Sequence, residues 1–155
     1  MTKTNVMRLL EAAGIPYEAL EYEYDENDLS GGHAADFLGL PREQVFKTLV
    51  TRGAGGLYVF CVPVCSELDL KKAASACGEK KIEMIHVREL QDLTGYLRGG
   101  CSPVGMKKKY PTYVDETAVL YDRIAVSGGR RGVQIRLDPA ALCGYLQADM
   151  ADLTE

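Results

Sequence analysis

Residues 46–62, FKTLVTRGAGGLYVFCV, contain two β-rich runs on either side of a glycine-rich centre. Runs rich in β-branched and aromatic residues that flank a Gly-containing loop are typical of a β-hairpin. The second run, residues 57–62, is apolar at consecutive positions, so we expect both of its faces to be covered. The pattern therefore predicts an interior strand in a sheet that helices pack against.

The segments on both sides of this hairpin alternate between short helical and short extended patterns. A second hairpin is predicted around the glycines and arginines of residues 128–132, and Asp138-Pro139 is a favourable start for a closing helix. No regular βαβ order is present. We therefore predict an α/β fold, mixed and α+β-like, around a curved, largely antiparallel sheet. The expected helices cover residues 4–13, 33–38, 41–45, 68–77, 87–93 and 139–146, and the expected strands cover 17–23, 46–51, 57–62, 81–85, 112–114, 123–127 and 133–137.

Length and composition are those of a globular protein. The chain has 155 residues, of which 46% are hydrophobic and 26% charged, enough for one self-sufficient core, so we expect a single domain over residues 1–155. No run approaches the roughly 20 apolar residues that span a bilayer, and no apolar signal segment follows Met1. We expect a cytoplasmic protein without a membrane partner.

The formal net charge of −4 argues against binding nucleic acid through bulk charge. Basic residues nevertheless form local clusters, each of which could be an anion site or simply a solvated charged face. These clusters are Lys71-Lys72, Lys80-Lys81, Lys107-Lys108-Lys109 and Arg130-Arg131.

The cysteines and histidines do not form a familiar metal or triad pattern. The chain has five cysteines, an odd number, and no Cys-x-x-Cys, while Cys61, Cys65, Cys77 and His86 lack the spacing of a usual zinc site. His33 and His86 are the two imidazoles, and no Gly-x-Ser-x-Gly is present. We therefore predict neither a metal nor a cofactor, and the pattern argues against a conventional triad hydrolase.

Two polar residues in predicted strands could face a ligand. Strand alternation places Lys47 on the same face as Leu49, where it could point into a cleft and bind a phosphate or a carbonyl oxygen. An edge lysine that discourages aggregation is the alternative. Ser127 ends a predicted strand just before Gly128, where its hydroxyl could reach a ligand.

The glycine pair Gly99-Gly100 lets a ligand approach the backbone closely. The N–H groups in this segment could bind an oxyanion if the local geometry turns them inward. A simple chain reversal before Pro103 is the alternative. Both interpretations stay open on these residues alone.

Three blocks of sequence, taken in order, resemble the YbaK family of bacterial aminoacyl-tRNA deacylases, which is similar to the editing domain inserted in prolyl-tRNA synthetases. The blocks are VFKTL at 45–49, TGYLRGGCSPVG at 94–105 and VSGGRRG at 126–132. The segments LDLKKA at 68–73 and KKIEM at 80–84 extend the likeness over nearly the whole chain. They resemble the branch whose substrate is cysteine mischarged on proline tRNA.

The resemblance implies a mixed, strongly curved sheet or barrel flanked by helices. It also implies the reaction that the protein catalyses. The reaction is removal of cysteine from Cys-tRNA(Pro), and from unprotected Cys-tRNA(Cys), by attack of the substrate's own thiol on its ester. It also implies the acceptor end of tRNA(Pro) as partner, and the sequence pI of about 5.3 makes help from a prolyl-tRNA synthetase plausible. Alternatives are a deacylase of Ala-tRNA(Pro) or another small aminoacyl-tRNA, and a non-catalytic module that binds tRNA ends or a synthetase.

The resemblance also implies roles for individual residues. Lys47 would bind the phosphate of the terminal adenosine or steady the ester, and Gly99 and Gly100 would let the ester approach. The N–H groups of Gly100 and Cys101 would receive the carbonyl oxygen, and Ser127 would hold the aminoacyl group or its ribose. The remaining candidates for substrate binding are Tyr22, Ser102, Pro103, Gly128, Gln134, Lys107, Lys108, Arg130 and Arg131.

Two positions depart from the family pattern. Gln134 stands seven residues after Ser127, where members commonly have an acidic residue, so a carboxylate role is not carried over to it. Tyr24 stands where a histidine is usual. Cys101 occupies the variable position of Gly-Gly-x-Ser-Pro, which argues against a nucleophilic role for its thiol.

Overall fold

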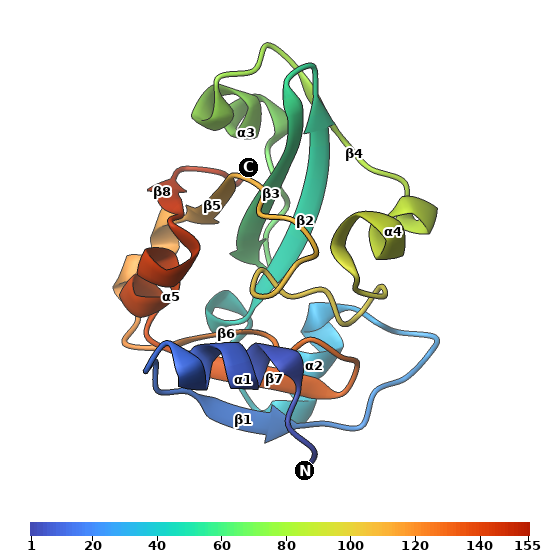
Figure 1. Ribbon diagram of the computed structural model, residues 1–155, viewed down its shortest axis with the longest axis vertical. Coiled ribbons are helices and arrows are strands. Elements are labelled where there is room, and N and C mark those ends of the chain that lie inside the picture. Colours follow the sequence, from blue (N-terminus) through green and yellow to red (C-terminus); the bar gives the residue numbers. More distant parts are fainter.

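The computed structural model describes residues 1–155 and contains two β-sheets (Figure 1). One sheet has five strands in the order β4-β2-β3-β5-β8, and the other has three in the order β1-β7-β6. The strands are β1 (Glu18–Glu21), β2 (Phe46–Gly53), β3 (Gly56–Pro63), β4 (Ile82–Met84), β5 (Thr112–Asp115), β6 (Ile124–Ser127), β7 (Val133–Leu137) and β8 (Asp149–Ala151).

The predicted hairpin at residues 46–62 forms β2 and β3. The two strands pair antiparallel from Phe46 opposite Pro63 to Gly53 opposite Gly56. Strand β3 lies in the middle of its sheet, and its residues 59–63 are buried, which confirms the predicted interior strand. Its other neighbour, β5, runs parallel to it, as β8 does to β5, whereas all other strand pairs are antiparallel. The mixed, largely antiparallel architecture is confirmed.

The two sheets meet where β2 begins. Val45, just before β2, forms a parallel bridge with Ala125 of β6. Figure 1 shows β2 and β3 running along the molecule and the three-stranded sheet lying across their lower end. The barrel is not closed, and the curvature takes the form of two sheets joined at this bridge. A site at the start of β2 can therefore be lined from both sheets.

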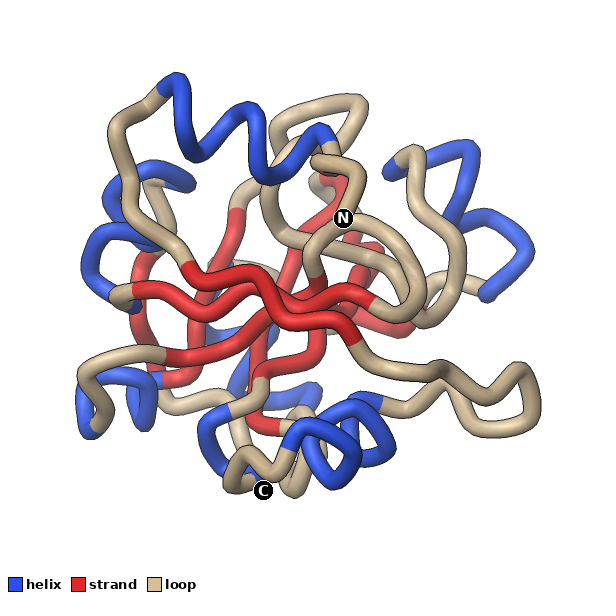
Figure 2. Tube along the Cα trace, turned by 90° about the horizontal axis from the view of Figure 1, so that it is seen from below, coloured by secondary structure: helices blue, strands red, loops and turns tan.

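Helices surround the strands on the outside (Figure 2). Side-chain oxygens of Thr4, Ser30, Asp69 and Asp138 accept N–H bonds in the first turns, as N-caps do. None of the helices combines the length and apolar character that crossing a membrane requires. The helices are α1 (Asn5–Ala12), α2 (Gly31–Leu38), α3 (Leu70–Cys77), α4 (Leu90–Thr94) and α5 (Pro139–Leu146), with 3₁₀ turns η1 (Arg42–Gln44), η2 (Val87–Glu89) and η3 (Glu116–Leu120).

Three local predictions need correction. Helix α2 begins at Gly31 rather than at residue 33, and β1 is shorter than the expected 17–23. Strand β8 was not expected, because its three residues include only one large apolar side chain, Met150. Short elements of this kind depend on their neighbours: β8 exists because β5 offers an open edge for parallel pairing.

Phe60 is the largest fully buried side chain, and it stacks on Tyr113 with ring centroids 5.4 Å apart. We predict that Phe60→Ala lowers the free energy of unfolding by about 3–5 kcal/mol, because the change leaves a cavity in the core between β3 and α3. Urea titration followed by circular dichroism measures this. Phe37→Ala is the control, since Phe37 is 53% exposed. An equal loss in both variants would contradict the assignment of Phe60 to the core.

Candidate active site

A small pocket of about 110 Å³ lies where the start of β2 meets the end of β6 and the start of β7. It brings together six of the residues that the sequence nominated: Tyr22, Lys47, Gly99, Cys101, Ser127 and Gln134. These come from segments that are far apart in the chain. The rest of the lining is Leu29, Ser30, Gly31, Val45, Phe46 and Thr48.

Lys47 is the positively charged residue of this pocket. It lies on β2, opposite Val62 of β3, and it lines the pocket, which favours the cleft lysine over the edge lysine of the alternative interpretation. Its side chain is 25% exposed, and its Nζ is 3.6 Å from Oε1 of Glu67, which is 78% exposed. An exposed ion pair of this kind contributes little. The ammonium group can therefore exchange Glu67 for an anionic ligand.

Ser127 and Gln134 face each other across the β6–β7 hairpin and are both buried. The Ser127 Oγ accepts a hydrogen bond from the Gly129 N–H at 3.2 Å, so its own O–H stays available as a donor. Gln134 Oε1 is a buried side-chain oxygen without a hydrogen-bond partner. Such an acceptor costs stability unless a ligand donates to it. Both residues thus offer hydrogen-bonding groups to a bound molecule.

The loop at residues 99–101 closes one side of the pocket, with Gly99 at φ +88°. A Cβ on Gly100 would lie 2.9 Å from Arg130 Cα, so this backbone packs directly on the neighbouring loop. The Gly100 N–H donates to the Leu97 carbonyl at 3.0 Å, which removes it from the pair of oxyanion donors expected from the sequence. The N–H of Cys101 remains as the donor of this loop.

The Cys101 thiol is a poor nucleophile. Burial raises its pKa to about 12, so the thiol stays protonated near neutral pH. Because the thiolate is the reactive form, this environment argues against covalent catalysis by Cys101. The Cys101 side chain therefore forms part of the pocket wall, which Lys47 and Ser127 also line.

The first turn of α2 is a part of the pocket that sequence reasoning missed. Ser30 caps this helix by accepting from the His33 N–H, and both Ser30 and Gly31 line the pocket. A helix N-terminus presents unpaired N–H groups and positive potential, which suit an anionic or carbonyl ligand. A Cβ on Gly31 would lie 2.3 Å from Val64 Cγ1, so this approach requires glycine. A serine cap before Gly31-Gly32 was the available sequence signal.

Several other nominated residues lie outside this pocket. Ser102 is fully buried, and its Oγ accepts from the Val104 N–H, so it shapes the loop and does not touch the pocket. A Cβ on Gly128 would lie 2.6 Å from Val133 Cγ1, which assigns this glycine to the turn. Ser102, Pro103 and Gly128 are thus absent from the lining of the small pocket, and their expected roles in substrate binding stay predictions.

The nominated basic residues fall into two groups. Arg130 and Arg131 line a second pocket together with Gly100, while Pro103 and Lys108 line a third one beside Tyr110. Lys107 is exposed and reaches the carbonyl oxygen of Asp92. None of these lysines and arginines lines the small pocket itself.

Comparison with known proteins adds the family. The model of the aminoacyl-tRNA editing domain matches residues 31–144. The chain is 47% identical over 153 residues, 98% of its length and 93% of the relative's, to "Putative Cys-tRNA(Pro)/Cys-tRNA(Cys) deacylase EbsC" of Enterococcus faecalis. It is 29% identical over 112 residues to a "Proline--tRNA ligase" of Thermosipho africanus, covering 72% of this chain and 20% of that enzyme.

A solved structure agrees with this relationship. The crystal structure of "a putative trans-editing enzyme for prolyl tRNA synthetase" superposes with a TM-score of 0.86 and 30% identity, covering 100% of this chain and 99% of that one. The matched region includes most of the small pocket, from Gly31 to Gln134. The chain belongs to the aminoacyl-tRNA editing domain family.

Proposed function

We propose that this protein is a trans-editing deacylase that releases cysteine from Cys-tRNA(Pro), and also acts on Cys-tRNA(Cys). The name of the Enterococcus relative, at 47% identity over almost the full chain, supports this substrate class. The observation that carries the proposal is a small pocket that offers one cation and several hydrogen-bonding groups around a thiol held in its unreactive form.

The pocket size suits a small aminoacyl group. Its volume of about 110 Å³ is well below the roughly 300–1,000 Å³ that is typical of pockets for larger ligands. A cysteinyl side chain consists of one methylene and one thiol, and it can enter a space of this size. The nucleotide that carries the ester must then lie outside.

The substrate supplies the nucleophile in this mechanism. The cysteinyl sulfur attacks the ester carbonyl carbon, the bond from that carbon to the ribose oxygen breaks, and the thiol proton ends on the released ribose hydroxyl. The products are free tRNA and a small cyclic thioester, which water opens to cysteine. Holding the thiol against its carbonyl can supply a large part of the roughly 7–11 kcal/mol available from proximity.

The pocket residues then bind and orient the substrate. The Ser127 O–H and the Cys101 N–H donate to the carbonyl oxygen as negative charge develops on it. Lys47 stabilises the same charge or the phosphate of the terminal nucleotide. The Gln134 carboxamide oxygen accepts a hydrogen bond from the ammonium group of the aminoacyl ester. This bond would give the buried oxygen the partner that it otherwise lacks.

A prolyl-tRNA synthetase is the proposed partner. Supporting this, the Thermosipho ligase carries a related segment that accounts for 20% of its length, so one chain there combines synthesis and this domain. The net charge of −4 gives this protein little general attraction for tRNA. Delivery of the mischarged acceptor end by a synthetase would compensate for weak binding.

The first prediction from the proposed function concerns substrate choice and Lys47. We expect single-turnover assays to show release of cysteine from Cys-tRNA(Pro), with Ala-tRNA(Pro) and Ser-tRNA(Pro) stable, because only cysteine carries the attacking thiol. Lys47→Ala should slow the reaction by about 10²- to 10³-fold, the usual effect of losing one charge-stabilising group. Lys71→Ala, which removes an exposed lysine from α3, is the matched control.

Other outcomes would change the assignment. Hydrolysis of the alanyl and seryl esters would show that the thiol is dispensable and would favour a deacylase of small aminoacyl-tRNAs in general. No release from any ester, with tRNA binding that depends on Lys47, would favour a non-catalytic tRNA-end module.

A second prediction uses the unpaired oxygen of Gln134. Gln134→Met keeps the shape of the side chain and removes its polar atoms. We therefore expect the free energy of unfolding to stay unchanged or to rise by up to about 1–3 kcal/mol. The same change should weaken substrate binding and raise KM, because the acceptor for the ammonium group is lost. Calorimetry and steady-state kinetics measure the two effects. Lower stability together with unchanged KM would contradict a ligand-facing role.

A further inference from the structure

A second and larger pocket lies behind the loop that closes the small site. Its volume is about 440 Å³, and its lining includes Tyr24, Gln91, Arg130 and Arg131. Gly99 lines the small pocket and Gly100 lines the larger one, so the two cavities share a wall of backbone. The volume falls in the range of about 300–1,000 Å³ that is typical of ligand pockets, which admits a mononucleotide.

The charge of the larger pocket is positive and unopposed. None of its nine lining residues is acidic, and neither Arg130 nor Arg131 takes part in an ion pair. The Arg131 Nε donates to the Arg98 carbonyl at 2.8 Å, which fixes this side chain across the loop and leaves its terminal amino groups free. A guanidinium group held in this way matches the oxygens of a phosphate, and Arg130 adds a second positive charge beside it.

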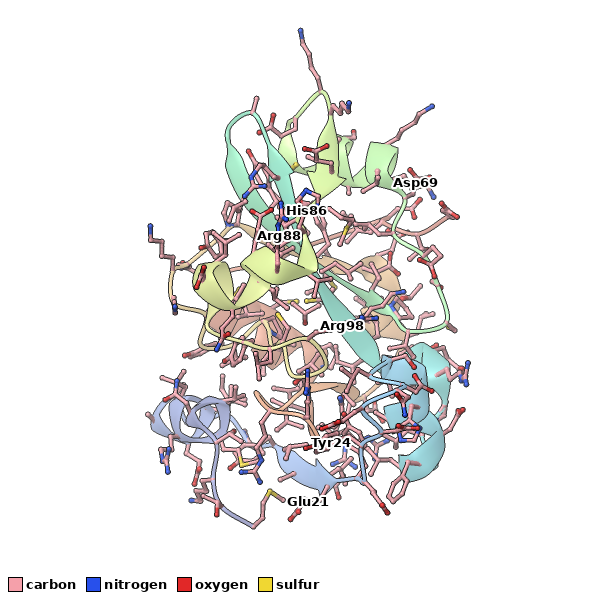
Figure 3. All side chains as sticks on the ribbon, turned by 90° about the vertical axis from the view of Figure 1, so that its right-hand side faces the viewer. Glu21, Tyr24, Asp69, His86, Arg88 and Arg98 are labelled. Carbon is pink, nitrogen blue, oxygen red and sulfur yellow. The ribbon has the colours of Figure 1, made fainter.

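An aromatic ring borders the same pocket. Tyr24 is 44% exposed, and a Cβ on Gly132 would lie 3.2 Å from its Cδ1, so one side of the ring rests on that glycine. Figure 3 shows Tyr24 and Arg98 on the same face of the molecule, with Arg88 farther from Tyr24. An aromatic ring beside guanidinium groups is how proteins bind single-stranded RNA: the base stacks and the phosphate is neutralised.

We propose that the larger pocket binds the nucleotide that precedes the aminoacylated terminal nucleotide of a tRNA 3′ end. Its base stacks on Tyr24, its phosphate lies against Arg130 and Arg131, and Gln91 hydrogen-bonds an edge of the base. The terminal nucleotide then crosses the wall at Gly99-Gly100 and places its ester in the small pocket. This inference rests on the proposed function and adds a subsite that reads the single strand.

The test compares two cysteinyl esters that differ by one nucleotide. The first is cysteinyl-adenosine, which reaches the small pocket alone, and the second is the cysteinyl ester of the dinucleotide CpA. We expect Tyr24→Ala to lower kcat/KM for the dinucleotide ester by about 5- to 100-fold, through KM, and to leave the adenosine ester unaffected. Tyr24→Phe, which keeps the ring, should behave as wild type.

The arginines are tested in the same assay. Arg130→Gln should weaken dinucleotide binding and flatten its salt dependence, because one phosphate contact is lost. Arg88→Ala is the matched control, since Arg88 is exposed on η2 and lies outside the pocket. Equal effects of Tyr24→Ala on both esters, no effect on either, or equal effects of the two arginine variants would overturn the proposal.

Binding of uncharged CpA, followed by NMR, separates this inference from the proposed function. If the wild type cleaves neither ester and still binds CpA in a way that Tyr24→Ala abolishes, the deacylase function fails and the nucleotide subsite stands. If the wild type cleaves both esters with equal kcat/KM and does not bind CpA, the function stands and the subsite is wrong.

Discussion

The structure depends on the burial of both faces of β3. Successive side chains of this strand enter different cores: Cys61 belongs to the larger cluster beneath α1, while Phe60 and Val62 belong to the cluster beneath α3. Because side chains alternate along a strand, this arrangement needs apolar residues at consecutive positions. β2 is then held in register against β3, and Lys47 falls at the junction of the two sheets.

Local chemistry predicts most of the elements. Both hairpins follow from β-rich runs around glycines, and the start of the closing helix follows from Asp138, whose side chain accepts an N–H bond, and from Pro139. What the sequence does not predict is long-range pairing. The bridge from Val45 to Ala125 and the parallel addition of β8 depend on contacts between distant segments, for which no local pattern exists.

The candidate site, like the fold, was predictable only where local sequence determines the geometry. Ser127 and Gln134 could be nominated together because a hairpin places them opposite each other. The hydrogen bond from the Gly100 N–H to Leu97 and the one that the Ser102 Oγ accepts from Val104 depend on exact loop geometry, which the sequence does not predict. The first turn of α2 was missed since the helix was expected to begin two residues later, beyond Ser30 and Gly31. Family resemblance supplied the reaction, and the structure supplied the arrangement of the groups around it.

The close packing of Gly100 on Arg130 and of Gly31 on Val64 has a consequence for how substrate preference can change. Gly31 lines the small pocket and Gly100 follows Gly99, which also lines it; neither Gly31 nor Gly100 has room for a Cβ, so a side chain at either position requires its neighbours to move. We expect a shift toward a different aminoacyl group to come instead from other lining residues, among which Tyr22, Thr48 and Gln134 have replaceable side chains. The pocket thus combines glycine positions that tolerate no side chain with positions whose side chains can be exchanged.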